Sequence, residues 1–109
     1  LGSDITEGGR SEYQALAQLH ALPPDHIQAQ IAAYAAAKLL EEGLRRAGRT
    51  LNRLELVDAL EALYAYETGL TPPLTYGPNR RIGARGAHLV TVDLLTKSYQ
   101  PVGGWHQLR

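Results

Sequence analysis

The spacing of apolar residues changes its period at Gly69, and this change restricts the chain to a mixed architecture. Before Gly69, apolar residues recur every three to four positions, as on one face of an α-helix. Beyond it the period becomes two, with Val90, Val92 and Leu94 on one face of a predicted strand. The sequence therefore predicts an α+β arrangement in which about three helices precede a small antiparallel sheet.

The first two helices are predicted over about residues 6–21 and 25–47. Thr6 can cap the first helix, and a Pro-Pro pair ends that segment. Asp25 offers a carboxylate cap for the second helix, and Gly48 is a natural left-handed stop. We expect the alanine-rich stretch 32–37 to let another backbone approach closely, because it carries little side-chain bulk.

The third helix is predicted over about residues 53–66. Asn52 is a good N-cap, and Glu55 stands three residues later, where its carboxylate can reach back to the cap. Gly69 is the expected left-handed terminator. The predicted core face consists of Leu56, Leu60 and Leu63, with Tyr64 alongside.

Three strands are predicted, over about residues 74–76, 87–95 and 99–102. Gly77, Pro78 and Asn79 supply the turn after the first strand. A second turn just before residue 99 would join the last two strands as a hairpin. Trp105 follows two glycines, and we expect its ring to be buried.

Composition excludes several classes of protein. Eleven basic and eleven acidic side chains give no net charge, so the chain has no long-range attraction for nucleic acid or an anionic membrane. The absence of cysteine excludes disulfides and thiol catalysis. The chain contains no methionine, so Leu1 is not expected to be a translation start, and we interpret residues 1–109 as a single partial domain of a larger protein.

The sequence gives little support for an enzyme or for a bound cofactor. The four histidines lack the spacing that puts two imidazoles on one helix face, so no metal site is predicted. Glu41 and Glu42 are expected to pair with Arg45 and Arg46 rather than to act as a general acid and base. The remaining basic cluster is expected to lie in a solvated loop and comprises Arg80, Arg81 and Arg85.

The segment from Thr68 to Gly83, TGLTPPLTYGPNRRIG, identifies a family resemblance. It follows an alanine-rich helix and an asparagine-capped helix, and it precedes a terminal strand pair that closes on Gly103-Gly-Trp105. In this order of elements, the chain from about Asp4 to Trp105 resembles the C-terminal part of type I periplasmic substrate-binding proteins of the branched-chain amino-acid class. These are two-lobed α/β proteins that close on a small ligand and deliver it to an ATP-driven membrane permease.

The resemblance implies a location, partners and a site. The parent protein would be an extracytoplasmic, periplasmic or extracellular, receptor for an amino acid or a similar small polar metabolite, and its partner would be a membrane permease. Gln28, Gln30 and Tyr34 are the candidate ligand-binding residues, although core packing of Tyr34 and solvent exposure of the two glutamines are the alternative. Because most of the ligand cleft would lie outside this chain, we expect the chain alone not to bind the ligand.

A second hypothesis assigns the chain to an interaction, oligomerisation or sensory module without a transport role. The alanine-rich helix face and unpaired strand edges are surfaces that drive dimerisation. On either hypothesis the isolated chain is expected to form a homodimer.

Overall fold

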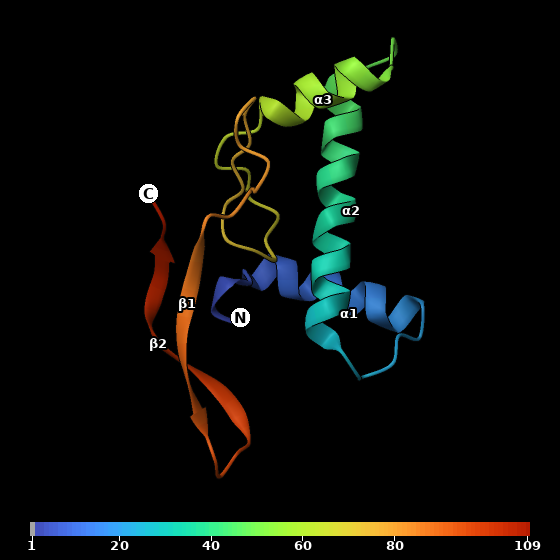
Figure 1. Ribbon diagram of the computed structural model, residues 1–109. Coiled ribbons are helices and arrows are strands. Elements are labelled where there is room, and N and C mark those ends of the chain that lie inside the picture. Colours follow the sequence, from blue (N-terminus) through green and yellow to red (C-terminus); the bar gives the residue numbers. More distant parts are fainter. Residues whose placement is uncertain (1) are drawn as a thin grey trace.

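A computed structural model describes residues 2–109, so that Leu1, where the predicted domain begins, lies outside the described residues. Within that range the chain forms helices and one two-stranded antiparallel sheet (Figure 1). Three helices followed by an antiparallel pair agree with the predicted α+β class. The elements are a 3-10 helix η1 (Gly2–Asp4), α1 (Glu7–Leu19), α2 (Ile27–Ala47), α3 (Arg53–Glu61), β1 (Gly86–Asp93) and β2 (Ser98–Gln107).

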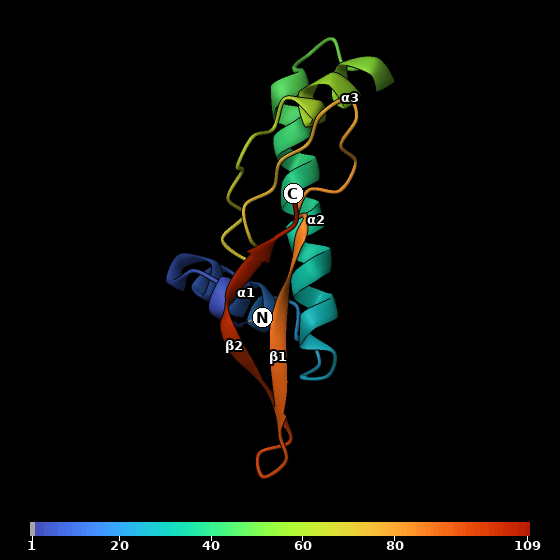
Figure 2. The ribbon, with the colours of Figure 1, turned by 60° about the vertical axis from the view of Figure 1, so that its left-hand side comes forward.

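The molecule is elongated and built around α2. Helix α1 crosses one end of α2, α3 packs at the other end, and the hairpin β1–β2 extends as an arm (Figures 1 and 2). The principal extents are 54 × 39 × 20 Å, and the Cα radius of gyration is 16.0 Å. A compact chain of this length would have a radius of about 13 Å. The fold therefore leaves much of its surface uncovered.

Two of the predicted helix caps are present. The Thr6 hydroxyl accepts a hydrogen bond from the Gly9 amide at 3.0 Å, and Asn52 Oδ1 accepts one from the Glu55 amide at 3.0 Å. Each bond satisfies an amide that the first helical turn leaves without a partner. Helix α2 ends at Ala47, and the residue that caps it, Gly48, has a φ of 78° in the left-handed region.

The predicted cap at Asp25 is wrong. Helix α2 begins at Ile27, and its N-cap residue is His26, which has a φ of 57° and makes no side-chain cap. The Gln30 side-chain amide donates to the carbonyl oxygens of Pro23 and Asp25 at 2.8 and 2.9 Å. These bonds hold the preceding residues as a loop against the first turn of α2, so the helix starts later than predicted.

Helix α3 is shorter than predicted, and Gly69 does not terminate it. The helix ends at Glu61, because the next residues exchange helical bonds for bonds to the segment 74–76. The Leu63 carbonyl accepts from Tyr76, and the Ala65 amide donates to the Thr75 hydroxyl. As a result Leu63 is buried, whereas Tyr64, predicted to lie beside the core face, is 84% exposed.

The predicted strand at 74–76 is also wrong. Leu74 forms an isolated bridge with Tyr66, with hydrogen bonds in both directions, and no ladder continues from it within residues 2–109. The turn predicted after this segment is present, since Gly77 and Arg80 exchange backbone hydrogen bonds. The segment is held by separate backbone bonds to Leu63, Tyr66 and Gly83 rather than by a continuous ladder, so it is not a strand.

The hairpin has the predicted antiparallel pairing with different bounds. Asp93 Oδ1 accepts from the Leu95 and Thr96 amides at 2.9 and 3.4 Å, which turns the chain two residues before the predicted end of β1 at residue 95. Strand β2 continues well past its predicted end at residue 102. Its pairing is interrupted between Pro101 and Trp105 and then resumes to Gln107.

The hydrophobic core is small. Among residues 2–109, the buried apolar side chains belong to Ala35, Leu63 and Leu70. Gly43 on α2 permits close packing of α3, because a Cβ atom there would lie 2.7 Å from Leu60 Cδ2. Most of the alanine-rich stretch 32–37 is exposed. Within the described range, no helix has the length and apolar character required to cross a bilayer.

Candidate functional site

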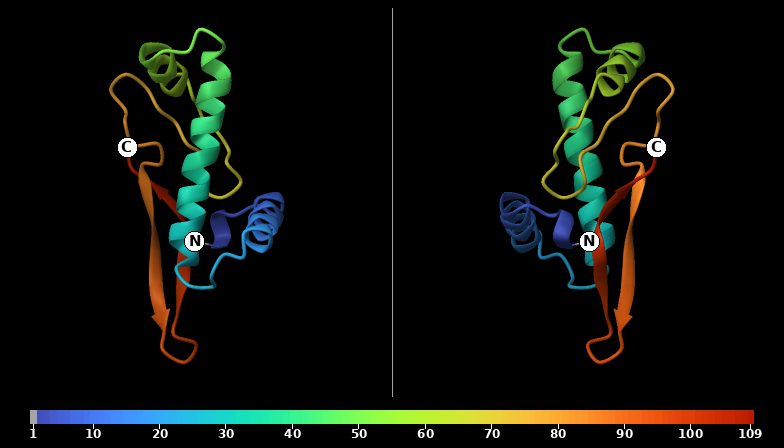
Figure 3. Two further views of the ribbon diagram at one scale, coloured as in Figure 1. Left: turned by 90° about the vertical axis from the view of Figure 1, so that its right-hand side faces the viewer. Right: turned by 90° about the vertical axis from the view of Figure 1, so that its left-hand side faces the viewer.

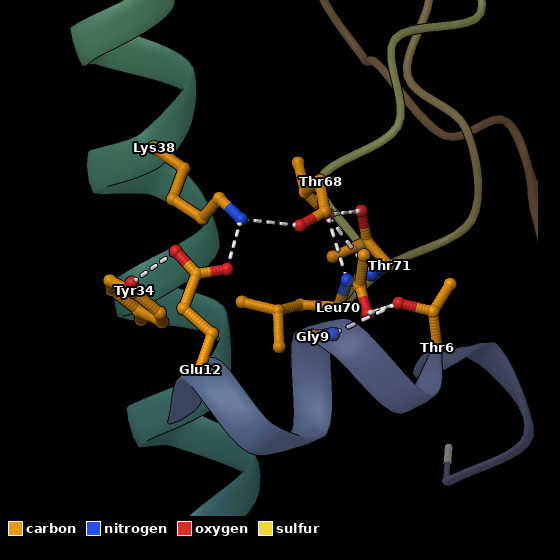
Figure 4. A network of polar contacts seen from close by, with 9 residues as sticks. Thr6, Gly9, Glu12, Tyr34, Lys38, Thr68, Leu70 and Thr71 are labelled. Carbon is orange, nitrogen blue, oxygen red and sulfur yellow. Dashed lines mark hydrogen bonds and ion pairs between the residues drawn. The ribbon is translucent and has the colours of Figure 1, made fainter. Parts of the chain in front are cut away.

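The junction of α1 with the loop after Gly69 brings the two ends of the helical half together. The Thr6 amide donates to the Gly69 carbonyl at 2.9 Å, and the Thr6 hydroxyl contacts the same oxygen at 3.3 Å. A Cβ atom on Gly9 would collide with that carbonyl group. Figure 4 shows Thr6 and Gly9 next to the loop that carries Thr68 and Leu70. The glycine is therefore required for the close approach of the helix to the loop.

A polar network lies next to this junction and joins α1, α2 and the loop (Figure 4). Lys38 Nζ donates to Glu12 Oε2 at 2.7 Å and to the Thr68 carbonyl at 2.8 Å. The Tyr34 hydroxyl donates to Glu12 Oε1 at 2.6 Å. Each oxygen of the Glu12 carboxylate thus has a donor, and the lysine binds the loop to both helices.

The network shifts the pKa of two of its members. The Lys38 ammonium, followed by the Tyr34 hydroxyl, lowers the pKa of Glu12 below its ordinary value of 4.5. The hydrogen bond to Glu12 raises the pKa of Tyr34 to about 12. Both shifts favour the charge state in which the hydrogen bonds form.

The Thr68 side chain fixes the conformation of the loop by hydrogen bonds to amides within the same loop. Its side chain is fully buried, and its hydroxyl accepts from the Leu70 and Thr71 amides at 3.1 Å each. The same hydroxyl is 2.8 Å from the Thr71 hydroxyl. This side-chain-to-backbone turn gives the TGLT part of the segment 68–83 a defined shape.

An open groove of about 510 Å³ lies between η1, α1, the first turns of α2 and the loop. This volume is in the range of small-molecule sites. Isoleucines and a leucine provide its apolar walls, and Arg10 and Asp4 bring opposite charges to it. The lining residues include Asp4, Ile5, Arg10, Tyr13, Gln28, Ile31 and Leu70.

A histidine and a carboxylate attach the hairpin to the N-terminal segment next to this groove. His88 Nε2 lies 2.8 and 2.9 Å from the two oxygens of Asp4. The His88 ring packs edge-on against Trp105, with ring centroids 5.2 Å apart. Trp105 is half-buried, and its indole N–H donates to Gln107 Oε1 at 3.2 Å. Within residues 2–109, His88 Nδ1 is buried without a hydrogen-bond partner.

The structure places the three predicted ligand-binding residues in three different environments. Gln28 lines the groove and is exposed. Gln30 packs against the loop that precedes α2. Its Oε1 accepts from the Tyr13 hydroxyl at 2.7 Å, and its Nε2 donates to the carbonyl oxygens of Pro23 and Asp25. Tyr34 is half-buried in the polar network. Of the three, only Gln28 lines the groove.

The two charged groove residues, Asp4 and Arg10, were not predicted as site residues. Each stands in a polar stretch without a motif, and the groove forms only when α1, α2 and the loop come together. No motif in the sequence marks either residue. The signal that the sequence did carry was the unusual loop itself, which supplies one wall.

The glutamates and arginines near the end of α2 are paired, as predicted. Arg45 contacts Glu41 and Glu42 at 3.1 and 2.9 Å, and Arg46 contacts Glu42 at 2.8 Å. In the following loop, Arg80 donates to the Gly83 carbonyl at 3.0 Å, and Arg81 pairs with Glu61 at 2.6 Å. No cluster of three or more metal-ligating side chains occurs among residues 2–109.

Comparisons of the chain with known protein families, with curated proteins and with solved structures found no match.

Proposed function

We propose that this chain is a segment of an extracytoplasmic solute receptor, which binds an amino acid or similar small polar metabolite for ABC-type uptake. The segment corresponds to the C-terminal part of the type I substrate-binding proteins that the sequence resembles. In this proposal the ligand site is completed by polypeptide outside residues 2–109, and a membrane permease is the partner of the parent receptor.

The observation that carries the proposal is the amount of apolar surface left uncovered on an otherwise well-defined fold. Large apolar side chains are exposed on every helix and on both strands, and contiguous exposed apolar surface is a mark of interaction sites. The most exposed members are Leu19 and Leu54 on the helices, Tyr64 just after α3, and Leu89, Leu94, Leu95 and Tyr99 on the hairpin. A lobe that lacks its neighbouring sheet would expose such surfaces.

The family-like loop supports the same proposal by its construction. Its TGLT part is fixed by the buried Thr68 hydroxyl, and Lys38 binds it to both long helices. These bonds tie the sequence of the loop to a specific shape, which a free linker would not have.

The groove supplies only part of an amino-acid site. An amino-acid ligand needs an acceptor for its ammonium group and donors for its carboxylate, and Arg10 with Gln28 provides donors. The carboxylate of Asp4 is already bound by His88. We therefore expect that the chain alone does not bind the ligand and that the parent supplies the missing groups.

A second candidate function is an interaction or sensory module without transport. It is favoured by the hairpin, which extends as an arm and has exposed apolar residues on both faces (Figure 2). This candidate and the receptor predict different ligand behaviour, because only a receptor must bind a metabolite.

The proposal is tested on the open reading frame that contains this sequence. The full-length product is purified, and its thermal stability is measured with a panel of amino acids and related small acids and amines. A receptor shows a rise in Tm with one ligand class, whereas an interaction module shows none with any member of the panel. Loss of the response in the Gln28→Ala variant would place the groove in the ligand site.

A further inference from the structure

The two strands of the hairpin differ in their free edges. On β2, Pro101 has no backbone N–H to offer to a further strand. Between Pro101 and Trp105, three residues of β2 stand opposite Leu89 alone, and Gly103 has a φ of 79°. Proline and bulges are the features that protect a sheet edge from pairing. The edge of β2 is therefore blocked.

The edge of β1 has none of these features. Gly86–Asp93 contains no proline, and within residues 2–109 its backbone groups bond only to β2. In the views of Figure 3 no other segment runs along the outer side of β1. Its first charged residue apart from a histidine is Asp93, at its end. An edge of this kind can accept another strand.

The residues around β1 are complementary to themselves in the antiparallel direction. Arg85 directly precedes the strand and Asp93 ends it, so an antiparallel copy brings the basic end of each strand to the acidic end of the other. When the pairing is centred on Leu89, Arg85 is opposite Asp93 at both ends, Ala87 is opposite Thr91, and Leu89 is opposite its own counterpart. These residues share one face of the strand, because side chains alternate.

We propose that β1 pairs antiparallel with β1 of a second copy of this chain, centred on Leu89, so that two hairpins form one four-stranded sheet. The two-fold axis passes between the two Leu89 side chains, each of which is 60% exposed in the single chain. The pairing gives hydrogen-bond partners to the backbone groups on the open edge of β1 in both copies, and it creates two Arg85–Asp93 ion pairs.

The ion pairs are compatible with the turn that Asp93 holds. The two turn bonds use Oδ1 of Asp93, so Oδ2 can accept from the guanidinium of the second copy. Within residues 2–109 the Arg85 side chain is exposed and forms no ion pair. The basic partner is thus free to reach across the axis.

This inference goes beyond the proposed function, because it concerns association of the 109-residue chain with itself. A chain that remains monomeric overturns the pairing and leaves the receptor proposal standing. A parent protein that ignores every ligand overturns the receptor proposal and leaves the pairing standing.

The register is tested by cysteine cross-linking, since the protein contains no cysteine of its own. Leu89→Cys is compared with Val102→Cys, on β2, and Leu95→Cys, at the hairpin tip, where the side chain is 95% exposed. With a short cysteine-to-cysteine linker, the Leu89→Cys chain is expected to form covalent dimer at least about tenfold faster than either control, because opposed side chains lie ~5 Å apart. A mixture of the Ala87→Cys and Thr91→Cys chains is expected to yield the mixed dimer preferentially. Equal rates at positions 89, 95 and 102 would overturn the register.

The charge pairing is tested by sedimentation equilibrium on the full chain. Arg85→Glu places two carboxylates opposite each other at both ends, and its dimer dissociation constant is expected to rise at least about tenfold. Arg49→Glu makes the same charge change at the distant α2–α3 turn and is expected to leave dimerisation unchanged. Circular dichroism verifies that both variants are folded. A monomeric unsubstituted chain, or equal effects of the two variants, would contradict the pairing.

Discussion

Gly9 and Gly69 are in direct backbone contact, although 60 positions separate them along the chain. The carbonyl group of Gly69 occupies the space that a side chain on Gly9 would need, and Gly69 itself has a φ of 78°. The adjacent Thr6 amide and hydroxyl bind the same carbonyl. This contact joins the first helix to the loop that follows Gly69.

Gly9→Ala is expected to destabilise the chain. Its methyl group meets backbone atoms that cannot rotate away, so either α1 or the loop must move, at a cost of ~1–3 kcal/mol. Gly8→Ala is the matched control, because nothing lies within 4 Å of its added Cβ and alanine favours a helix by ~0.5–1 kcal/mol. Urea unfolding measures both. A Gly9→Ala chain as stable as Gly8→Ala would show that the close contact is not maintained.

Stability is expected to fall at high pH because of Tyr34. Its pKa is raised from 10.0 to about 12, so its hydrogen bond contributes fully below pH 10 and is lost as the pH rises toward 12. Tyr34→Phe removes this dependence while keeping the ring. The measurement is the unfolding free energy of both chains across that window, together with the difference in tyrosinate absorbance. Ionisation of Tyr34 at its ordinary pKa would contradict the network.

Stability is also expected to fall at low pH because of Glu12. The pKa of its carboxyl group is lowered in the folded chain, so its contribution is present above the ordinary pKa of 4.5 and is lost as the pH falls through the lowered value. Glu12→Gln should flatten this part of the acid unfolding profile. Glu7→Gln, on an exposed position of the same helix, serves as the control. Identical acid profiles for Glu12→Gln and the unsubstituted chain would argue against the bond to Lys38.

Asn52→Ala is expected to lower the unfolding free energy by about 1 kcal/mol. The substitution removes the acceptor for the Glu55 amide at the start of α3. Asn52→Ser retains an acceptor of similar capping strength and should restore most of the loss. Chemical unfolding of the three chains distinguishes a true cap from an incidental contact, for which alanine and serine would behave alike.

The sequence predicted those features that depend on neighbouring residues. The caps at Thr6 and Asn52, the stop at Gly48 and the antiparallel hairpin all follow from patterns a few residues long. The wrong boundaries depend on distant partners. Helix α3 ends early because Leu63 and Ala65 bond to the segment 74–76, and no local signal announces that exchange.

The candidate site was less predictable than the fold. Gln30 and Tyr34 were predicted as ligand-binding residues from the family resemblance, but Tyr13 and Glu12 of another helix already bind them. Gln28 does line the groove. Which polar group stays free depends on how α1 crosses α2, and the sequence gives no measure of that crossing.

Ligand binding by the parent protein and by this chain, measured side by side, tests the central claim most directly. The full-length product and the 109-residue chain are each titrated calorimetrically with the same panel of amino acids. The receptor proposal predicts saturable binding of one amino acid or close analogue to the full-length protein and no binding to the chain alone. A full-length protein that binds no member of the panel would contradict the proposal, and binding by the isolated chain would show that these residues carry the whole site.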